Sequence, residues 1–173
     1  TVSPRGKLYV VCKGDAFASP AIDMVIHVLD PNTLALESTI TFAPGTTGGP
    51  LTWDTNGRLY IGSSYTASIV AVDGWSDTVL RNGGATAIVP NDASWIAAMR
   101  RLPGRREVLV GTPNFGPAGH QWQRFDAATD TNTNASSAIN FQQAGDTDPP
   151  GGIALLQADS AGVVFAGEVV SAT

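Results

Sequence analysis

The stretch NGRLYIGSS at residues 56–64 has a near copy, RGKLYVVCK, at residues 5–13. Two weaker copies of the same pattern follow at 106–111 and 162–167. The copies recur about every fifty residues, a spacing typical of proteins built from units that stack on one another. The repeat therefore decides the fold, and each unit has to be interpreted as one supersecondary structure.

A second element recurs in step with the first. VIHVLDPNT at 25–33, SIVAVDGWS at 68–76 and QWQRFDAAT at 121–129 each end a strand-like run in aspartate, which favours a turn. Further strand-like runs precede each LY stretch and follow each aspartate turn, so a full unit holds four short strands. The LY runs are apolar on consecutive residues, which predicts cover on both faces, whereas ESTITF at 37–42 alternates like an outer strand.

Four antiparallel strands per unit, repeated in this way, predict an all-β fold of the β-propeller type in a single domain. We place the units at approximately 1–47, 48–91, 92–150 and 151–173. The stretch 92–102 has a helix-compatible composition, but its register with the other first strands favours a strand. The units hold three, four, four and two strands, which predicts an incomplete ring. A closed four-blade ring and a fragment of a larger propeller are the alternatives.

The repeats resemble YVTN-type propeller repeats, with features of the NHL type. The resemblance rests on LYVV with VIHVLDPNTLALESTITF, and on GGPLTWDTNGRLYIGSSYTASIVAVD, which together cover about the first half of the chain. Families with such repeats include surface-layer and adhesion proteins, redox-enzyme propellers, lactonases and scaffolds. The resemblance thus implies a fold and leaves the activity open.

Composition narrows the class of partner. A net charge of −5 argues against nucleic acid as a partner, and no apolar run approaches the ~20 residues that span a bilayer. A composition poor in lysine and rich in threonine, asparagine and glycine favours a secreted or cell-surface protein. Cys12 is the only cysteine and lies in an apolar run, so we expect a buried, inert thiol.

A weak calcium pattern lies between two predicted strands. Asp130, Asn132 and Asn134 occupy alternate positions, as at the start of a calcium loop. Ala135 and Phe141 then stand where the loop needs glycine and glutamate, so we favour a polar loop, with calcium as the only cofactor suggested. Asn134 also begins a glycosylation sequon.

Candidate partner-binding residues are few. Trp75 lies in a predicted turn, and four arginines surround a Pro-Gly turn: Arg100, Arg101, Arg105 and Arg106. Trp75 suits a protein or carbohydrate ligand, and the arginines suit a polyanion or an acidic patch on a partner, although core packing of Trp75 and a charged, soluble hairpin explain these residues as well. His27 and His120 are far apart, and no Ser–His–Asp pattern is present, so we assign no catalytic or cofactor-binding residue.

These observations favour a non-enzymatic module that acts by binding or self-assembly, as a structural, adhesion or filament-forming protein. Open strand edges would make it a homo-oligomer or polymer. One alternative is part of a propeller enzyme, a lactonase-like hydrolase or an oxidoreductase, with a metal at the channel mouth. The loop acids that would converge there are Asp15, Asp23, Asp54, Asp92, Asp146 and Asp148. The other alternative is a scaffold for protein partners.

Overall fold

The structure is a computed structural model that describes residues 1–90, 93–102, 106–112, 121–132, 139–140, 153–158 and 164–168. Over these residues the chain consists of antiparallel strands and one turn of 3-10 helix, Gly84–Thr86. The all-β prediction is confirmed. Within the same residues, no helix has the length and apolar character needed to cross a membrane.

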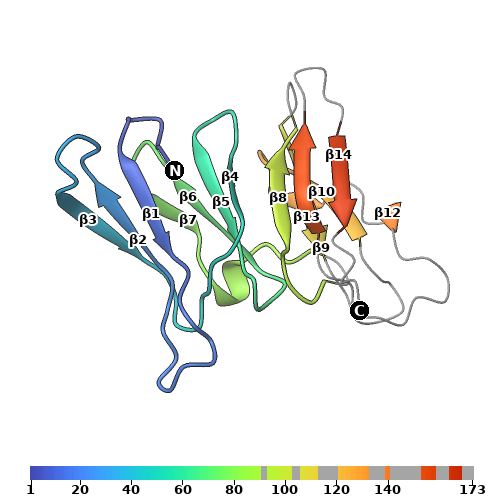
Figure 1. Cartoon of the computed structure of the whole chain (residues 1–173), viewed down its shortest axis with the longest axis horizontal. Coiled ribbons are helices and arrows are strands. Elements are labelled where there is room, and N and C mark those ends of the chain that lie inside the picture. The colour runs from blue at the N-terminus through green and yellow to red at the C-terminus, as the bar shows by residue number, and fades with distance from the viewer. Residues whose placement is uncertain are drawn as a thin grey trace.

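The strands form four separate sheets (Figure 1). The first sheet contains β1 (Leu8–Cys12), β2 (Val25–Leu29) and β3 (Leu36–Thr41). The second contains β4 (Leu51–Trp53), β5 (Arg58–Gly62), β6 (Ile69–Asp73) and β7 (Thr78–Arg81). In both sheets the strands pair in sequence order, as hairpins and meanders do.

The third sheet contains β8 (Ala98–Arg101), β9 (Glu107–Thr112), β10 (Gln121–Asp126), β11 (Thr131–Asn132) and β12 (Ile139–Asn140). Both β11 and β12 pair with β10. The fourth sheet pairs β13 (Ile153–Ala158) with β14 (Val164–Glu168). The segment at 92–102, which had the helix-compatible composition, therefore supplies a strand, as its register predicted.

The first three sheets follow one another in a row, with the first sheet at one end, and β13–β14 overlap the third sheet in this view (Figure 1). Their first strands come together, because β4 lies beside β8 and β8 lies beside β13. The backbone N–H of Arg101 in β8 donates to Thr52 Oγ1 in β4 at 3.2 Å. At the start of the chain, Val2 bridges to Leu8 and so occupies on β1 the place that Trp53 occupies on β5.

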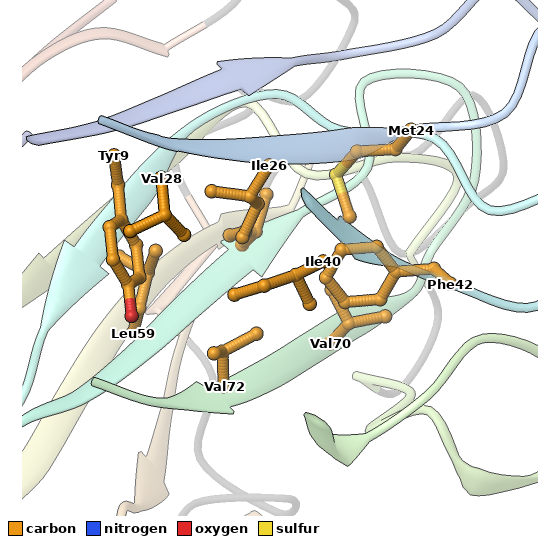
Figure 2. Close-up of a cluster of buried hydrophobic side chains, with 10 residues drawn as sticks. Tyr9, Met24, Ile26, Val28, Ile40, Phe42, Leu59, Val70 and Val72 are labelled. Carbon is orange, nitrogen blue, oxygen red and sulfur yellow. The ribbon is translucent and has the colours of Figure 1, made fainter. Parts of the chain in front are cut away.

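The largest core cluster lies between the first and second sheets. Figure 2 shows Ile26 and Val28 of β2 directed towards Val72 and the other buried side chains of the second sheet. Ile40 and Phe42 are buried in this cluster while Thr39 and Thr41 between and beside them are exposed. The outer strand therefore has one buried and one wet face, as its alternation predicted.

A second cluster joins the second and third sheets, and β5 contributes to both. Leu59 points into the first cluster and Tyr60 into the second, each fully buried. The prediction of cover on both faces is thus confirmed for β5. It is wrong for β1, where Val10 is 39% exposed and Cys12 is also exposed. Cys12 lies on the face of β1 that turns away from the second sheet, so its thiol is not buried as we expected.

The aspartate turns form as predicted. Oδ1 of Asp30, Asp73 and Asp126 each accepts the backbone N–H two residues later, at 2.8, 2.8 and 2.7 Å. Asp30 Oδ1 also accepts the N–H of Thr33 at 3.0 Å. Backbone N–H groups, from Thr33 and then Asn32 in the first turn, hold the pKa of Asp30 below its usual range. The N–H of Ala128 does the same for the pKa of Asp126.

Candidate functional site

One face of the first sheet has no cover among the described residues. We call it the uncovered face, and it consists of Val2, Leu8, Val10, Cys12, Val25, His27, Leu29, Leu36, Thr39 and Thr41. These positions alternate along the strands with residues such as Tyr9 and Ile26, which point to the second sheet. Val2 and Leu36 are 58% and 59% exposed. The face is therefore mostly apolar, with polar positions at His27, Thr39 and Thr41, and it is partly to fully exposed when only the described residues are considered.

The second sheet shows what this kind of face does when it is covered. Leu59 pairs with Val72 in β5 and β6, as Leu8 pairs with Leu29 in β1 and β2. In the second sheet these positions pack against the first sheet, and both are 0% exposed. The uncovered face thus has the register and apolar character of a face built to pack on another sheet.

Polar groups lie on the uncovered face and beside it. Lys7 forms an ion pair with Glu37 and approaches Asp30 at 3.9 Å. His27 Nδ1 lies 3.1 Å from Thr39 Oγ1 on the neighbouring strand. His27 is thus a half-buried sheet residue whose ring nitrogen has a hydroxyl partner.

A tyrosine–aspartate contact joins each of the first two sheets to the sheet that follows. The Tyr60 hydroxyl lies 2.7 Å from the Ala127 carbonyl oxygen and 3.1 Å from Asp130 Oδ1, in the turn after β10. The Tyr9 hydroxyl donates in the same way to Asp77, in the turn after β6. Asp77 and Asp130 share a left-handed backbone, with φ of 58° and 56°. The contact therefore repeats with the sheets.

Arginines hold the two aspartates from the other side. Arg81 Nε donates to Asp130 Oδ2 at 2.7 Å, and Arg5 pairs with Asp77. The first sheet has no such aspartate, because Leu34 occupies the equivalent turn position with φ of 58° and is 63% exposed. A sheet that covered the uncovered face would therefore meet a leucine where the other junctions offer a carboxylate.

Tyr60→Phe is expected to lower the free energy of unfolding at pH 7 by about 1 kcal/mol, because the Ala127 carbonyl and Asp130 each lose one of their donors and keep only the arginine bonds. Burial, followed by the charge of Asp130, raises the pKa of Tyr60, although a bond from Arg58 opposes the shift. A raised pKa in the folded state contributes stability that is complete below the ordinary value of about 10 and is lost as the pH rises above it. The variant should therefore lose less stability than the wild type above pH 10.

Urea denaturation at pH 7 and across the alkaline range measures both effects. Tyr65→Phe is the matched control, because no described hydrogen bond uses the Tyr65 hydroxyl, and it should change stability by less than about 0.5 kcal/mol. Equal effects of the two substitutions would show that the Tyr60 contact contributes nothing.

The predicted partner-binding residues lie on two different sheets. Trp75 follows β6, is 57% exposed and donates from Nε1 to the Asn56 carbonyl at 3.0 Å. Arg100 and Arg101 belong to β8, and Arg106 pairs with Asp126 at 3.5 Å. Arg105 lies outside the described residues. No hydrogen bond or ion pair in the described part of the chain joins Trp75 to these arginines.

The residues of the weak calcium pattern have other surroundings. Asp130 binds Tyr60 and Arg81, Asn132 is the last residue of β11, and Asn134 lies outside the described residues. Across the part of the chain that the structure describes, no three histidine, cysteine, aspartate or glutamate residues group as metal ligands do.

Of the loop acids proposed for an enzyme, Asp15 and Asp23 lie near each other and Asp54 lies at the other end of the strands. Asp15 and Asp23 each accept a backbone N–H, from Phe17 at 2.8 Å and from Gly45 at 2.7 Å, beyond the end of β1. Asp54 lies before β5, at the other end of the strands, and its Oδ1 caps the β4–β5 turn. Asp92, Asp146 and Asp148 lie outside the described residues. The three described acids thus stabilise turns and do not converge.

Sequence reasoning missed the tyrosine–aspartate contact. Its signal is present in the spacing, since an aspartate follows the turn aspartate by four residues at Asp73–Asp77 and Asp126–Asp130. A tyrosine stands at the same place in the first two LY runs, at Tyr9 and Tyr60. The two patterns belong to consecutive repeats, so only the packing of one sheet on the next shows that they meet.

No family model and no curated protein matches the chain. Among solved structures, the chain is similar to hydrazine synthase of Kuenenia stuttgartiensis, with a TM-score of 0.61 and 18% identity. The match covers 93% of this chain and 46% of that chain, so this chain spans about half the length of that structure. At this identity the likeness shows the fold alone.

Proposed function

We propose that the four sheets are consecutive β-propeller blades and that the protein is a non-enzymatic module acting through self-association. Three features support the propeller: the strand order within the sheets, the packing of consecutive sheets face to face, and the adjacency of their first strands. The YVTN-like character and the secreted or cell-surface location remain part of the same proposal.

The observation that carries self-association is the uncovered face. A contiguous apolar sheet face is costly in water, and such faces mark interaction sites. The sequence directed attention to open strand edges, but Thr1 and Val2 already bond along part of the β1 edge. We therefore assign the association surface to the face of the first sheet, with edge pairing as the alternative.

A second copy of this chain fits the face, with the two uncovered faces packed on each other around a two-fold axis. Such an isologous contact is the commonest arrangement in oligomers, and two sheets pack readily in this way. Lys7 and Glu37 place both charge signs beside the face, so a two-fold axis can bring opposite charges together. The tyrosine–aspartate contact of the other junctions is not needed here, because the uncovered face has no tyrosine and Leu34 replaces the aspartate that would accept a tyrosine hydroxyl.

Light scattering over a range of concentrations, with negative-stain images, tests the proposal. We expect a dimer of the 17.9 kDa chain that dissociates on dilution. Cys12 should react more slowly with a maleimide in the dimer, because its exposed thiol lies on the contact face. Rings or filaments would support edge or head-to-tail pairing instead. A monomer at every concentration would assign the face to a different chain and overturn self-association.

A further inference from the structure

A cavity of about 220 Å³ lies between the second and third sheets, away from the uncovered face. Its wall is formed by Arg81, the segment 86–90 and the nearby strands β9 and β10. Pockets for drug-sized ligands are larger, at about 300–1,000 Å³. The size of this cavity therefore suits a small molecule.

One charged group of the wall is held in a fixed orientation. Arg81 bonds Asp130 through Nε at 2.7 Å, and Asp130 is held in turn by the Tyr60 hydroxyl. This bond uses Nε and leaves the two terminal amino groups of Arg81 available. Neither of them has a hydrogen-bond partner among the described residues. A guanidinium offers two parallel N–H groups that match the two oxygens of a carboxylate.

The remaining wall combines an apolar part with polar groups from Thr86, Gln123 and Arg124. Ile88, Val89 and Pro90 line one side, and Val110 and Phe125 line the other. Phe125 is only 3% exposed and stacks edge-on with Tyr60, so this side is rigid. This apolar part favours a ligand with an organic body over a fully hydrated inorganic anion.

We propose that this cavity binds a small organic monocarboxylate, with the carboxylate on Arg81 and the apolar body between Ile88 and Phe125. Arg124 also lines the cavity, but Glu107 lies 3.7 Å from its Nη1, as Asp130 lies beside Arg81. The acids offset part of the positive charge, so binding depends on geometry and apolar contact. The inference is independent of self-association, because none of these residues belongs to the uncovered face.

Benzoate is a suitable probe, and benzamide is its neutral isostere. Calorimetric titration of the full chain should give one benzoate site with a dissociation constant on the order of 0.1–1 mM, given the few atoms of the ligand. Benzamide should bind at least tenfold more weakly. Equal binding of the two, or no saturable benzoate binding at tens of millimolar, would overturn the proposal.

Charge changes at the cavity wall locate the site. Val89 is 62% exposed, so Val89→Asp and Val89→Lys should leave the fold intact. We expect the aspartate variant to bind benzoate several-fold more weakly and the lysine variant more tightly. Arg81→Lys should weaken binding at least fivefold, because an ammonium lacks the planar pair of donors. Unchanged affinity in both Val89 variants would place benzoate elsewhere and overturn the assignment.

Discussion

Gly62→Val is expected to lower the free energy of unfolding by about 3 kcal/mol, a large share of the stability of a domain of this size. A Cβ atom at Gly62 would lie 2.5 Å from Ile96 Cγ2, 2.7 Å from Ile96 Cβ and 2.9 Å from Met99 Sδ. Ile96 is fully buried, so it has little room to move. The substitution would force the second and third sheets apart. Gly62→Ala should give a smaller loss in the same direction.

Urea denaturation of single and double variants tests this cause. Ile96→Ala alone should destabilise through the cavity it leaves, by about 2–4 kcal/mol. Combined with Gly62→Val, it should cost less than the sum of the two, because the added valine fills the cavity. Gly45→Ala is the control, because a Cβ added at Gly45 would have no atom within 4 Å and would clash with nothing. The φ of 79° is strained for alanine, so this variant should lose only about 1–2 kcal/mol of stability. Strict additivity at positions 62 and 96 would show that no clash exists.

The repeat determines most of the fold before any coordinates are known. The apolar pattern of a single strand is enough to distinguish the LY runs from the alternating run at 37–42, because the pattern reflects which faces of that strand meet solvent. The role of Gly62 can be inferred in the same way, since a glycine inside a buried strand indicates that a neighbouring part of the chain packs closely against it. A Cβ added at Gly62 would indeed meet Ile96. The antiparallel sheets and the aspartate turns follow from the same signals.

Features that depend on neighbouring sheets could not be predicted from one repeat at a time. Cys12 and Val10 belong to an apolar run like that of β5, and nothing in that run shows that one face lacks cover. The partners of Asp130 are equally hidden, because Tyr60 and Arg81 come from the preceding repeat. The alternate spacing of Asp130 and Asn132 suggested calcium for this reason, whereas the packing supplies a tyrosine and an arginine.

Val10→Glu combined with Leu36→Glu is expected to weaken self-association at least 100-fold, which corresponds to about 2.7 kcal/mol. Both side chains are exposed in the single chain, at 39% and 59%, so the monomer should keep its stability within about 0.5 kcal/mol. In the dimer both carboxylates would lose water inside an apolar contact and would face like charges from the partner. Light scattering on dilution should therefore show a monomer where the wild type is still a dimer.

A matched control and a rescue separate this effect from a general rise in negative charge. Leu80→Glu adds one negative charge, half that of the double variant, at a 41% exposed leucine on β7 outside the uncovered face, and should leave the dimer intact. A Val10→Lys, Leu36→Lys variant should also be monomeric alone, because its like charges repel in the same place. Mixed with the glutamate variant it should form a heterodimer, since opposite charges then meet across the contact. If Leu80→Glu dissociates the dimer as strongly, or if the mixture stays monomeric, the contact does not lie on this face.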